Sequence, residues 1–126
     1  MPVYAWQFVC EPGATKTWDV WVEGEAVTDF SLLFPPGPCG LLKVAVFYGL
    51  KKLYPYGEDQ WFAGDNCEVR FSDELPLPES PCRLRIVAVN EDEAYPHAFF
   101  VWMRTRPPRP RVEVRVAEGG TVEIVI

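Results

Sequence analysis

The 126 residues make one ordinary domain, long enough to bury an apolar core without metal or disulfide crosslinks. Hydrophobic residues make up 48% and aromatic residues 14%, which excludes a disordered chain, and no apolar run reaches the roughly 20 residues of a transmembrane helix. Residues 1–100 carry 7 basic and 15 acidic side chains, and residues 101–126 carry 5 and 3, so the body is strongly acidic. Nucleic acid and anionic membranes are therefore not expected as partners.

Apolar and polar residues alternate along most of the chain with the period of two that is typical of half-buried strands. In chain order, the predicted strands cover residues 4–9, 16–24, 41–50, 67–71, 83–90 and 98–105. Residues 41–50 and 98–105 are apolar at both parities, as expected of strands that are covered on both sides or face another chain. A helix over residues 40–57 is the alternative for one segment, but Val44 and Val46 favour a strand there.

With a C-terminal hairpin, these segments give about eight strands at intervals of roughly ten to fifteen residues. The turns between them are rich in the 13 Pro and 9 Gly of the chain. A single sheet would leave too many apolar faces in water. The pattern therefore predicts an all-β fold, an antiparallel β-sandwich of the jelly-roll or immunoglobulin-like kind.

Residues 107–126 are predicted to form a Pro/Arg spacer followed by a β-hairpin, beyond a sandwich body of residues 1–106. A two-residue turn at Gly119 and Gly120 would oppose unlike faces, whereas a three-residue loop over 118–120 places apolar residues opposite each other. The pairs predicted by this register are Val112–Ile126, Val114–Ile124, Val116–Val122 and, on the other face, Arg115–Glu123. The hairpin therefore has one Val and Ile face, which must be buried against something.

Two arrangements bury that face. The favoured one makes the hairpin the last two strands of the same sandwich, because strands adjacent in sequence usually pack together. In that case deleting residues 107–126 would expose two sheet edges and cause aggregation. The alternative treats the segment "RPPRPR" as a stiff extended spacer that carries the hairpin to a neighbouring copy.

Catalytic and metal-binding constellations are not recognisable in the sequence. The four Cys and the single His lack the spacing of a zinc site, and no nucleophile has a base beside it, so neither an enzyme nor a cofactor is expected. Free buried thiols are favoured over disulfides. The weak candidates for a calcium site are the acidic turn residues Asp65, Glu91, Asp92 and Glu93.

The aromatic residues exceed what one core face can take, and strand parity sends some of them outward. Outward aromatic and Arg side chains are typical of protein interfaces. The residues predicted to form an interface are Trp21, Phe99, Trp102, Arg104, Arg106, Arg109, Arg111, Val112, Val114 and Ile124. A loop that contains Tyr54, Tyr56 and Trp61 beside acidic residues is the alternative site, a platform for sugar rings.

The overall pattern is similar in kind to virion structural proteins such as capsid decoration and jelly-roll coat proteins, a likeness of architecture that covers no diagnostic motif. It implies a non-catalytic assembly module that binds itself or another structural protein, in the cytoplasm or in a virion, since the N-terminal residues show no signal peptide. The two Asn, two Gln and 13 Pro suggest a heat-adapted source. The alternatives are a carbohydrate-binding β-sandwich and, third, a small hydrolase that uses paired carboxylates such as Asp73 and Glu74.

Overall fold

The computed structural model describes residues 2–108, 113–116 and 122–125, and within these ranges the chain is all-β. The strands are β1 (Val3–Cys10), β2 (Thr15–Val22), β3 (Ala26–Phe34), β4 (Leu42–Tyr48), β5 (Lys51–Tyr54), β6 (Phe62–Ala63), β7 (Cys67–Pro76), β8 (Cys82–Asn90), β9 (His97–Arg106), β10 (Glu113–Val116) and β11 (Val122–Val125). The described ranges contain no helix, and so none that is long and apolar enough to cross a membrane. The helical alternative for residues 40–57 is therefore wrong.

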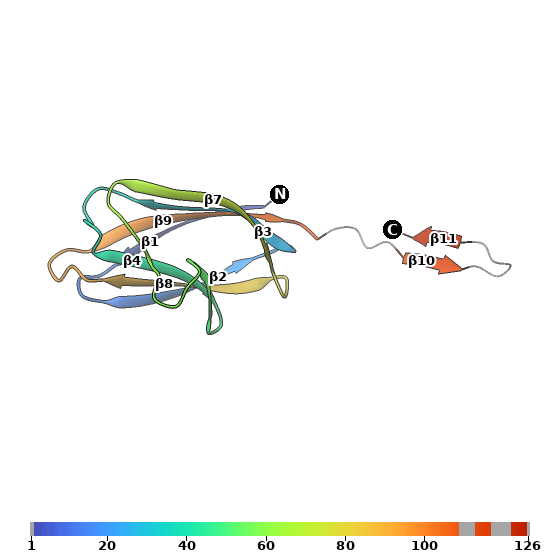
Figure 1. The fold of residues 1–126 in the computed structure, drawn as a ribbon, viewed down its shortest axis with the longest axis horizontal. Helices are drawn as coiled ribbons and strands as arrows, with labels where there is room; N and C mark the ends of the chain where they lie inside the picture. Colours follow the sequence, from blue (N-terminus) through green and yellow to red (C-terminus); the bar gives the residue numbers. More distant parts are fainter. Residues whose placement is uncertain (1, 109–112, 117–121, 126) are drawn as a thin grey trace.

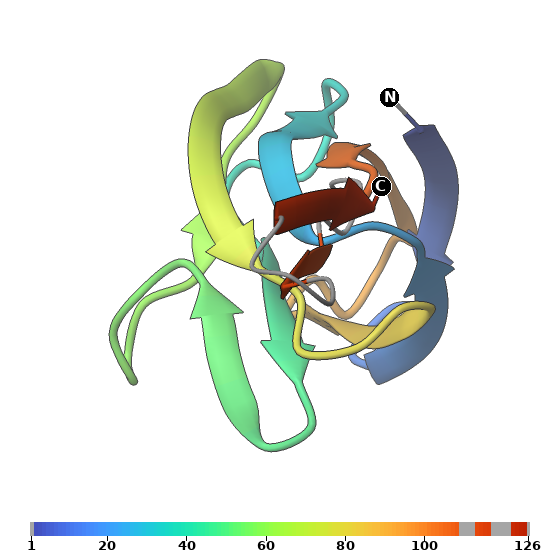
Figure 2. The same cartoon turned by 90° about the vertical axis from the view of Figure 1, so that its right-hand side faces the viewer.

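Two antiparallel sheets pack face to face, which confirms the predicted β-sandwich (Figure 1). One sheet has four strands in the order β1-β9-β3-β7. The other has the order β2-β8-β4-β5, and the short strand β6 also pairs with β4. Seen from the end in Figure 2, β1 forms one margin of its sheet and β7 forms the other.

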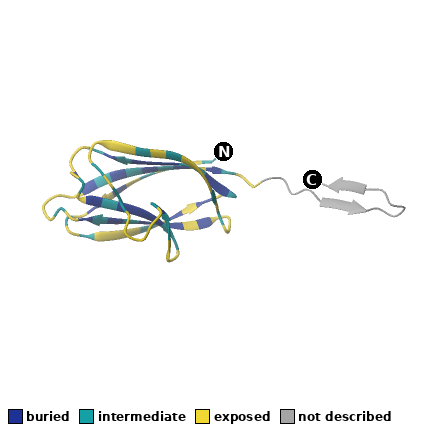
Figure 3. Cartoon of the chain, viewed as in Figure 1, coloured by how far each residue is buried: buried dark blue, intermediate teal, exposed yellow. Residues whose placement is uncertain are grey.

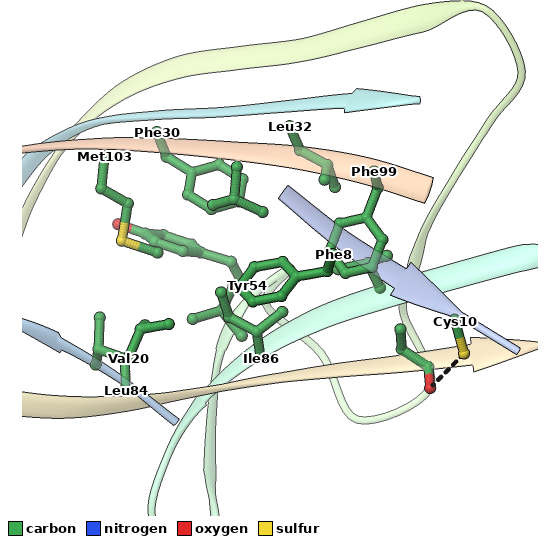
Figure 4. Close-up of a cluster of buried hydrophobic side chains, with 14 of the residues drawn as sticks. Phe8, Cys10, Val20, Phe30, Leu32, Tyr54, Leu84, Ile86, Phe99 and Met103 are labelled. Atoms are coloured by element: carbon green, nitrogen blue, oxygen red, sulfur yellow. Dashed lines mark hydrogen bonds between the residues drawn. The ribbon is translucent and has the colours of Figure 1, made fainter. Parts of the chain in front are cut away.

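The core lies between the sheets, and the strands alternate in burial as the period of two requires (Figure 3). Phe30, Leu32 and Phe99 from the four-stranded sheet meet Leu84 and Ile86 from the other sheet in a cluster of buried side chains (Figure 4). Burial of this apolar surface is the main favourable contribution to folding.

The C-terminal end of β9 is anchored where the chain leaves the sandwich. Gly24, in the turn between β2 and β3, has a φ of 138°, and a Cβ there would lie 2.6 Å from the carbonyl oxygen of Arg106. Only glycine permits this approach without a shift of the backbone. The adjacent Glu25 donates its backbone N–H to the same oxygen at 2.8 Å.

Strands β10 and β11 pair with each other in a separate two-stranded sheet, beyond the end of the sandwich in Figure 1. Their register, Val114 opposite Ile124 and Arg115 opposite Glu123, confirms the predicted one. The Val112–Ile126 pair and the loop 118–120 lie outside the described residues. The favoured expectation that the hairpin completes the sandwich differs from this pairing, in which neither of its strands joins a sheet of the body.

Candidate interaction surface

The outward face of the four-stranded sheet carries a pair of stacked aromatic rings. Phe100 and Trp102 are two residues apart on β9, and their ring centroids lie 6.0 Å apart with an angle of 12° between the planes. Both side chains are half-buried. Across the strand pairs, Ala5 of β1 lies opposite Trp102, and Leu33 of β3 lies opposite Phe100. On the other side of each ring lie Gln7 of β1, opposite Phe100, and Ser31 of β3, opposite Trp102, so the middle of this face is uncharged.

The prediction that Phe99 belongs to the interface is wrong. It points to the opposite side of β9 from Phe100 and is fully buried, with 0% exposed. Its ring packs on Phe8 and Trp18 at centroid distances of 5.3 and 5.7 Å. Consecutive residues of a strand face opposite sides, so Phe99 and Trp102 cannot share one surface.

The β7 side of the same face is polar and internally paired. Ser31 donates a hydrogen bond to Oε1 of Glu68 at 2.6 Å, and the Arg70 guanidinium binds the same oxygen at 2.9 Å. These two contacts, the hydroxyl first, hold the pKa of Glu68 below its ordinary value. The hydroxyl of Ser72 similarly lowers the pKa of Asp29, which accepts its hydrogen bond at 2.9 Å.

A shallow hollow of about 340 Å³ lies where the uncharged and charged parts of this face meet. Its lining includes Val3, Asp29, Arg70, Trp102 and Arg104. An aromatic ring flanked by acidic and basic groups suits a protein side chain better than a metal ion or a phosphate. We call this face, centred on Phe100 and Trp102, the outer aromatic face.

The two arginines of β9 that were predicted to meet a neighbouring copy contact acidic groups of their own body. Arg106 forms ion pairs with Glu25 at 2.8 Å and with Glu74 at 2.7 Å. Arg104 lies 3.9 Å from Asp29. Arg109, Arg111 and Val112 lie outside the described residues. For Val114 and Ile124, the structure describes the strand pairing only.

Trp21 lies on β2, in the other sheet from the outer aromatic face. Its side chain is 57% exposed, on the edge strand β2, opposite Arg83 of β8. Two residues before Trp21 on β2, Asp19 forms an ion pair with Arg85 of β8, with an N–O distance of 3.3 Å. The predicted interface residues whose side chains the structure describes therefore lie on two outward faces and, for Phe99, in the core.

The predicted sugar platform is not assembled as the sequence suggested. Tyr54 belongs to the core, and its hydroxyl donates to Asp73 at 2.7 Å, so burial and then this carboxylate raise the pKa of the phenol. The ammonium of Lys52 covers the Trp61 ring at 5.1 Å from its centroid. Tyr56 is 92% exposed and lines a shallow hollow with Trp61. Tyr54 is therefore removed from the predicted platform, and Tyr56 is the most exposed of its three rings.

Two of the four acidic candidates for a metal site, Asp65 and Asp92, stabilise turns. Asp65 accepts backbone hydrogen bonds from Gly37 at 2.8 Å and from Cys39 at 3.1 Å, and these lower its pKa. Asp92 accepts backbone N–H groups of the next turn and also binds His97 at 2.8 Å.

Glu91 pairs with Lys43 at 2.8 Å, and Glu93 is exposed. Over the described residues, no three acidic, Cys or His side chains come together as metal ligands would. The four cysteines are free, with Cys10 and Cys82 buried and Cys39 and Cys67 exposed.

The sequence predicted a strand over residues 4–9, but it did not predict that this strand, β1, lies at the edge of its sheet. Residues 3–10, "VYAWQFVC", contain no charged residue and no proline, and their pairing with β9 runs without a bulge. Val3 and Val9 are 61% and 42% exposed. The missing charges were visible in the sequence, but only the strand order shows that β1 is an edge.

No protein-family model and no curated protein matches the chain, so its function is inferred from the geometry of its own surface.

Proposed function

We propose that the chain is a non-catalytic assembly module that associates with further copies of itself, as coat or decoration proteins of a particle do. The observation that carries this proposal is the stacked pair Phe100–Trp102, half-exposed on the outer aromatic face. Aromatic rings in the middle of a surface with charged residues at its rim are the composition of a protein interface.

The other candidate functions have less support from the contacts of the described residues. The carboxylates that a hydrolase would need are engaged in fixed pairs: Asp73 with Tyr54, and Glu74 with Arg106. Lys52 lies over the ring of Trp61, where it competes with a stacked sugar. Assembly is therefore ranked above carbohydrate binding, and carbohydrate binding above hydrolysis.

The mass of the protein in solution at micromolar concentration tests this proposal. We expect the wild-type chain to be an oligomer and the double variant F100S/W102S to have a lower mass with its fold intact. W21S is the matched control, because Trp21 is equally aromatic but lies on the other sheet. A wild-type protein that stays monomeric and is retained on a glycan array would overturn the proposal in favour of sugar binding.

A further inference from the structure

The edges of the two sheets differ in how they are protected against pairing with another strand. Natural edge strands usually carry charges, prolines or bulges, or are very short, because their unpaired N–H and C=O groups can bind another chain. Strand β7 has charged residues at several positions, ends at Pro76, and faces a bulge in β3 between Val27 and Asp29. Strand β2 contains Lys16 and Asp19, and β5 has four residues, two of them Lys.

Strand β1 has none of these devices over eight residues. It pairs on one side with β9, and it forms the margin of its sheet (Figure 2). Its outward side chains Val3, Ala5, Gln7 and Val9 are all exposed and uncharged. Two of them, Val3 and Val9, are among the large hydrophobic residues that the described chain leaves in water.

We propose that β1 pairs antiparallel with β1 of a second copy, so that two four-stranded sheets join into one. This inference rests on the proposed self-association and names one of its contacts. A two-fold axis that passes Trp6 would place Trp6 opposite itself, Val3 opposite Val9 and Ala5 opposite Gln7. In an antiparallel pair, residues directly opposite share a face, so this register keeps every outward side chain outward.

The register follows from the residues at the strand ends. In this register, Val3 of each copy lies opposite Val9 of the other copy. A shift by two residues would leave one of these exposed valines without an opposite residue in the partner's β1. The usable edge ends before Cys10, whose carbonyl oxygen already accepts a hydrogen bond from Nδ2 of Asn90 at 3.1 Å. Because β1 is uncharged, no like charges meet in the self-pair.

A second copy fits this edge better than the C-terminal hairpin does. Strands β10 and β11 have four residues each and include Glu113, Arg115 and Glu123, so either one would cover only half of β1. The joined sheet also makes the outer aromatic faces of the two copies continuous, because Ala5 and Gln7 lie opposite Trp102 and Phe100 in the β1–β9 pair.

Charge placed on opposed positions tests the pairing in the full-length chain. In A5K/Q7K, the lysine introduced at position 5 of each copy would lie opposite the lysine introduced at position 7 of the other, whereas in the matched control A5K/Q7E opposite charges would meet. We expect the dimer dissociation constant of A5K/Q7K to exceed that of A5K/Q7E by about tenfold or more. Equal dissociation constants in the two variants would overturn the proposal.

Crosslinking tests the register independently of charge. In a background that lacks the exposed thiols, C39S/C67S, we expect coexpressed A5C and Q7C chains to form a disulfide with each other. Either variant alone would place its two thiols on diagonal positions about 7–8 Å apart at the Cα atoms, too far for a disulfide.

The outcomes separate this inference from the proposed function. A wild-type monomer would overturn both. An oligomeric wild type whose mixed A5C and Q7C chains do not crosslink would overturn the β1 pairing and leave assembly through another surface.

Discussion

The two halves of the four-stranded sheet have opposite surface chemistry. On the β3–β7 half, Ser31, Glu68 and Arg70 form a network of hydrogen bonds and ion pairs on the outward face. On the β1–β9 half, the outward residues include Ala5, Gln7 and the stacked rings of Phe100 and Trp102, with no charge until Arg104. The inward faces of both halves, in contrast, contribute to one continuous core.

This difference separates folding from association. Both halves need their inward residues in order to close the sandwich. The outward polar residues of the β3–β7 half pair within the chain, whereas the outward residues of β1 and the rings of Phe100 and Trp102 stay at least partly exposed. A surface that combines an uncharged edge with half-exposed aromatic rings is one that isolated proteins usually avoid. The β1–β9 half is therefore the side of the molecule on which a partner is expected.

The largest expected effect concerns neighbouring rings on the two sides of β9. Phe99→Ala should lower the free energy of unfolding by about 3–5 kcal/mol, because it leaves a cavity in the core. Phe100→Ala, one residue further and on the outward face, should lower it by about 1 kcal/mol or less. Denaturant unfolding of both variants measures the contrast.

The two variants should rank in the reverse order for association. Phe100→Ala is expected to weaken the oligomer, while the oligomer of Phe99→Ala should persist wherever the chain remains folded. Equal losses of stability at the two positions would show that the outer aromatic face is packed within the chain and would remove the contrast between the faces of β9.

The next largest effect on stability concerns the hydrogen bond that the hydroxyl of Tyr54, on β5, donates to Asp73, on β7. Tyr54 is only 7% exposed, so Asp73→Ala would leave a buried hydroxyl without its acceptor and should cost about 1–3 kcal/mol. Tyr54→Phe removes the donor and leaves Asp73, which is exposed, to water, so it should cost only about 0.5–1.5 kcal/mol. A larger loss for Tyr54→Phe would contradict the assignment of Tyr54 to the core.

The sequence predicted what depends on local periodicity. Alternation identified most strands, and the matching of apolar residues across a three-residue loop predicted the register of the hairpin. Alternation alone did not show which side of β9 faces the core, so Phe99 was assigned to the wrong face. It did not single out β3, because the bulge between Val27 and Asp29 shifts the alternation inside that strand. Nor did it place Tyr54 in the core or identify β1 as an edge, since both depend on which distant strands become neighbours.

Acid should weaken the hydrogen bonds of the β3–β7 half. Hydrogen bonds from Ser72 and Ser31 hold the pKa values of Asp29 and Glu68 below the ordinary 3.8 and 4.5. The folded chain therefore binds protons at these sites less readily than the unfolded chain. Their contribution to stability is complete at neutral pH and is lost as the pH falls from about 5 through the lowered values.

The double variant D29N/E68Q tests this pH dependence. Its free energy of unfolding should fall less steeply than that of the wild type over the acid range, as measured by denaturant unfolding at several pH values. If the free energies of unfolding of the two proteins fell equally with pH, the carboxylates of Asp29 and Glu68 would not contribute to stability.

The smallest expected effect on stability comes from deleting residues 107–126. From the sequence, we expected the truncated chain to aggregate. In the structure, however, β10 and β11 join neither sheet of the body. The truncated chain also keeps Arg106, which pairs with Glu25 and Glu74. We expect residues 1–106 to melt cooperatively, with a free energy of unfolding within about 1 kcal/mol of the full-length value.

The oligomeric state of this truncated chain then decides which segment covers the uncharged edge. If β1 pairs with β1, the truncated chain keeps its dimer and the crosslink between coexpressed A5C and Q7C chains. If the hairpin of a neighbour covers β1 instead, the truncated chain becomes a folded monomer without the crosslink. The eight uncharged residues of β1, against four in each hairpin strand, favour the dimer. Aggregation without cooperative melting would show that the hairpin packs on its own body after all.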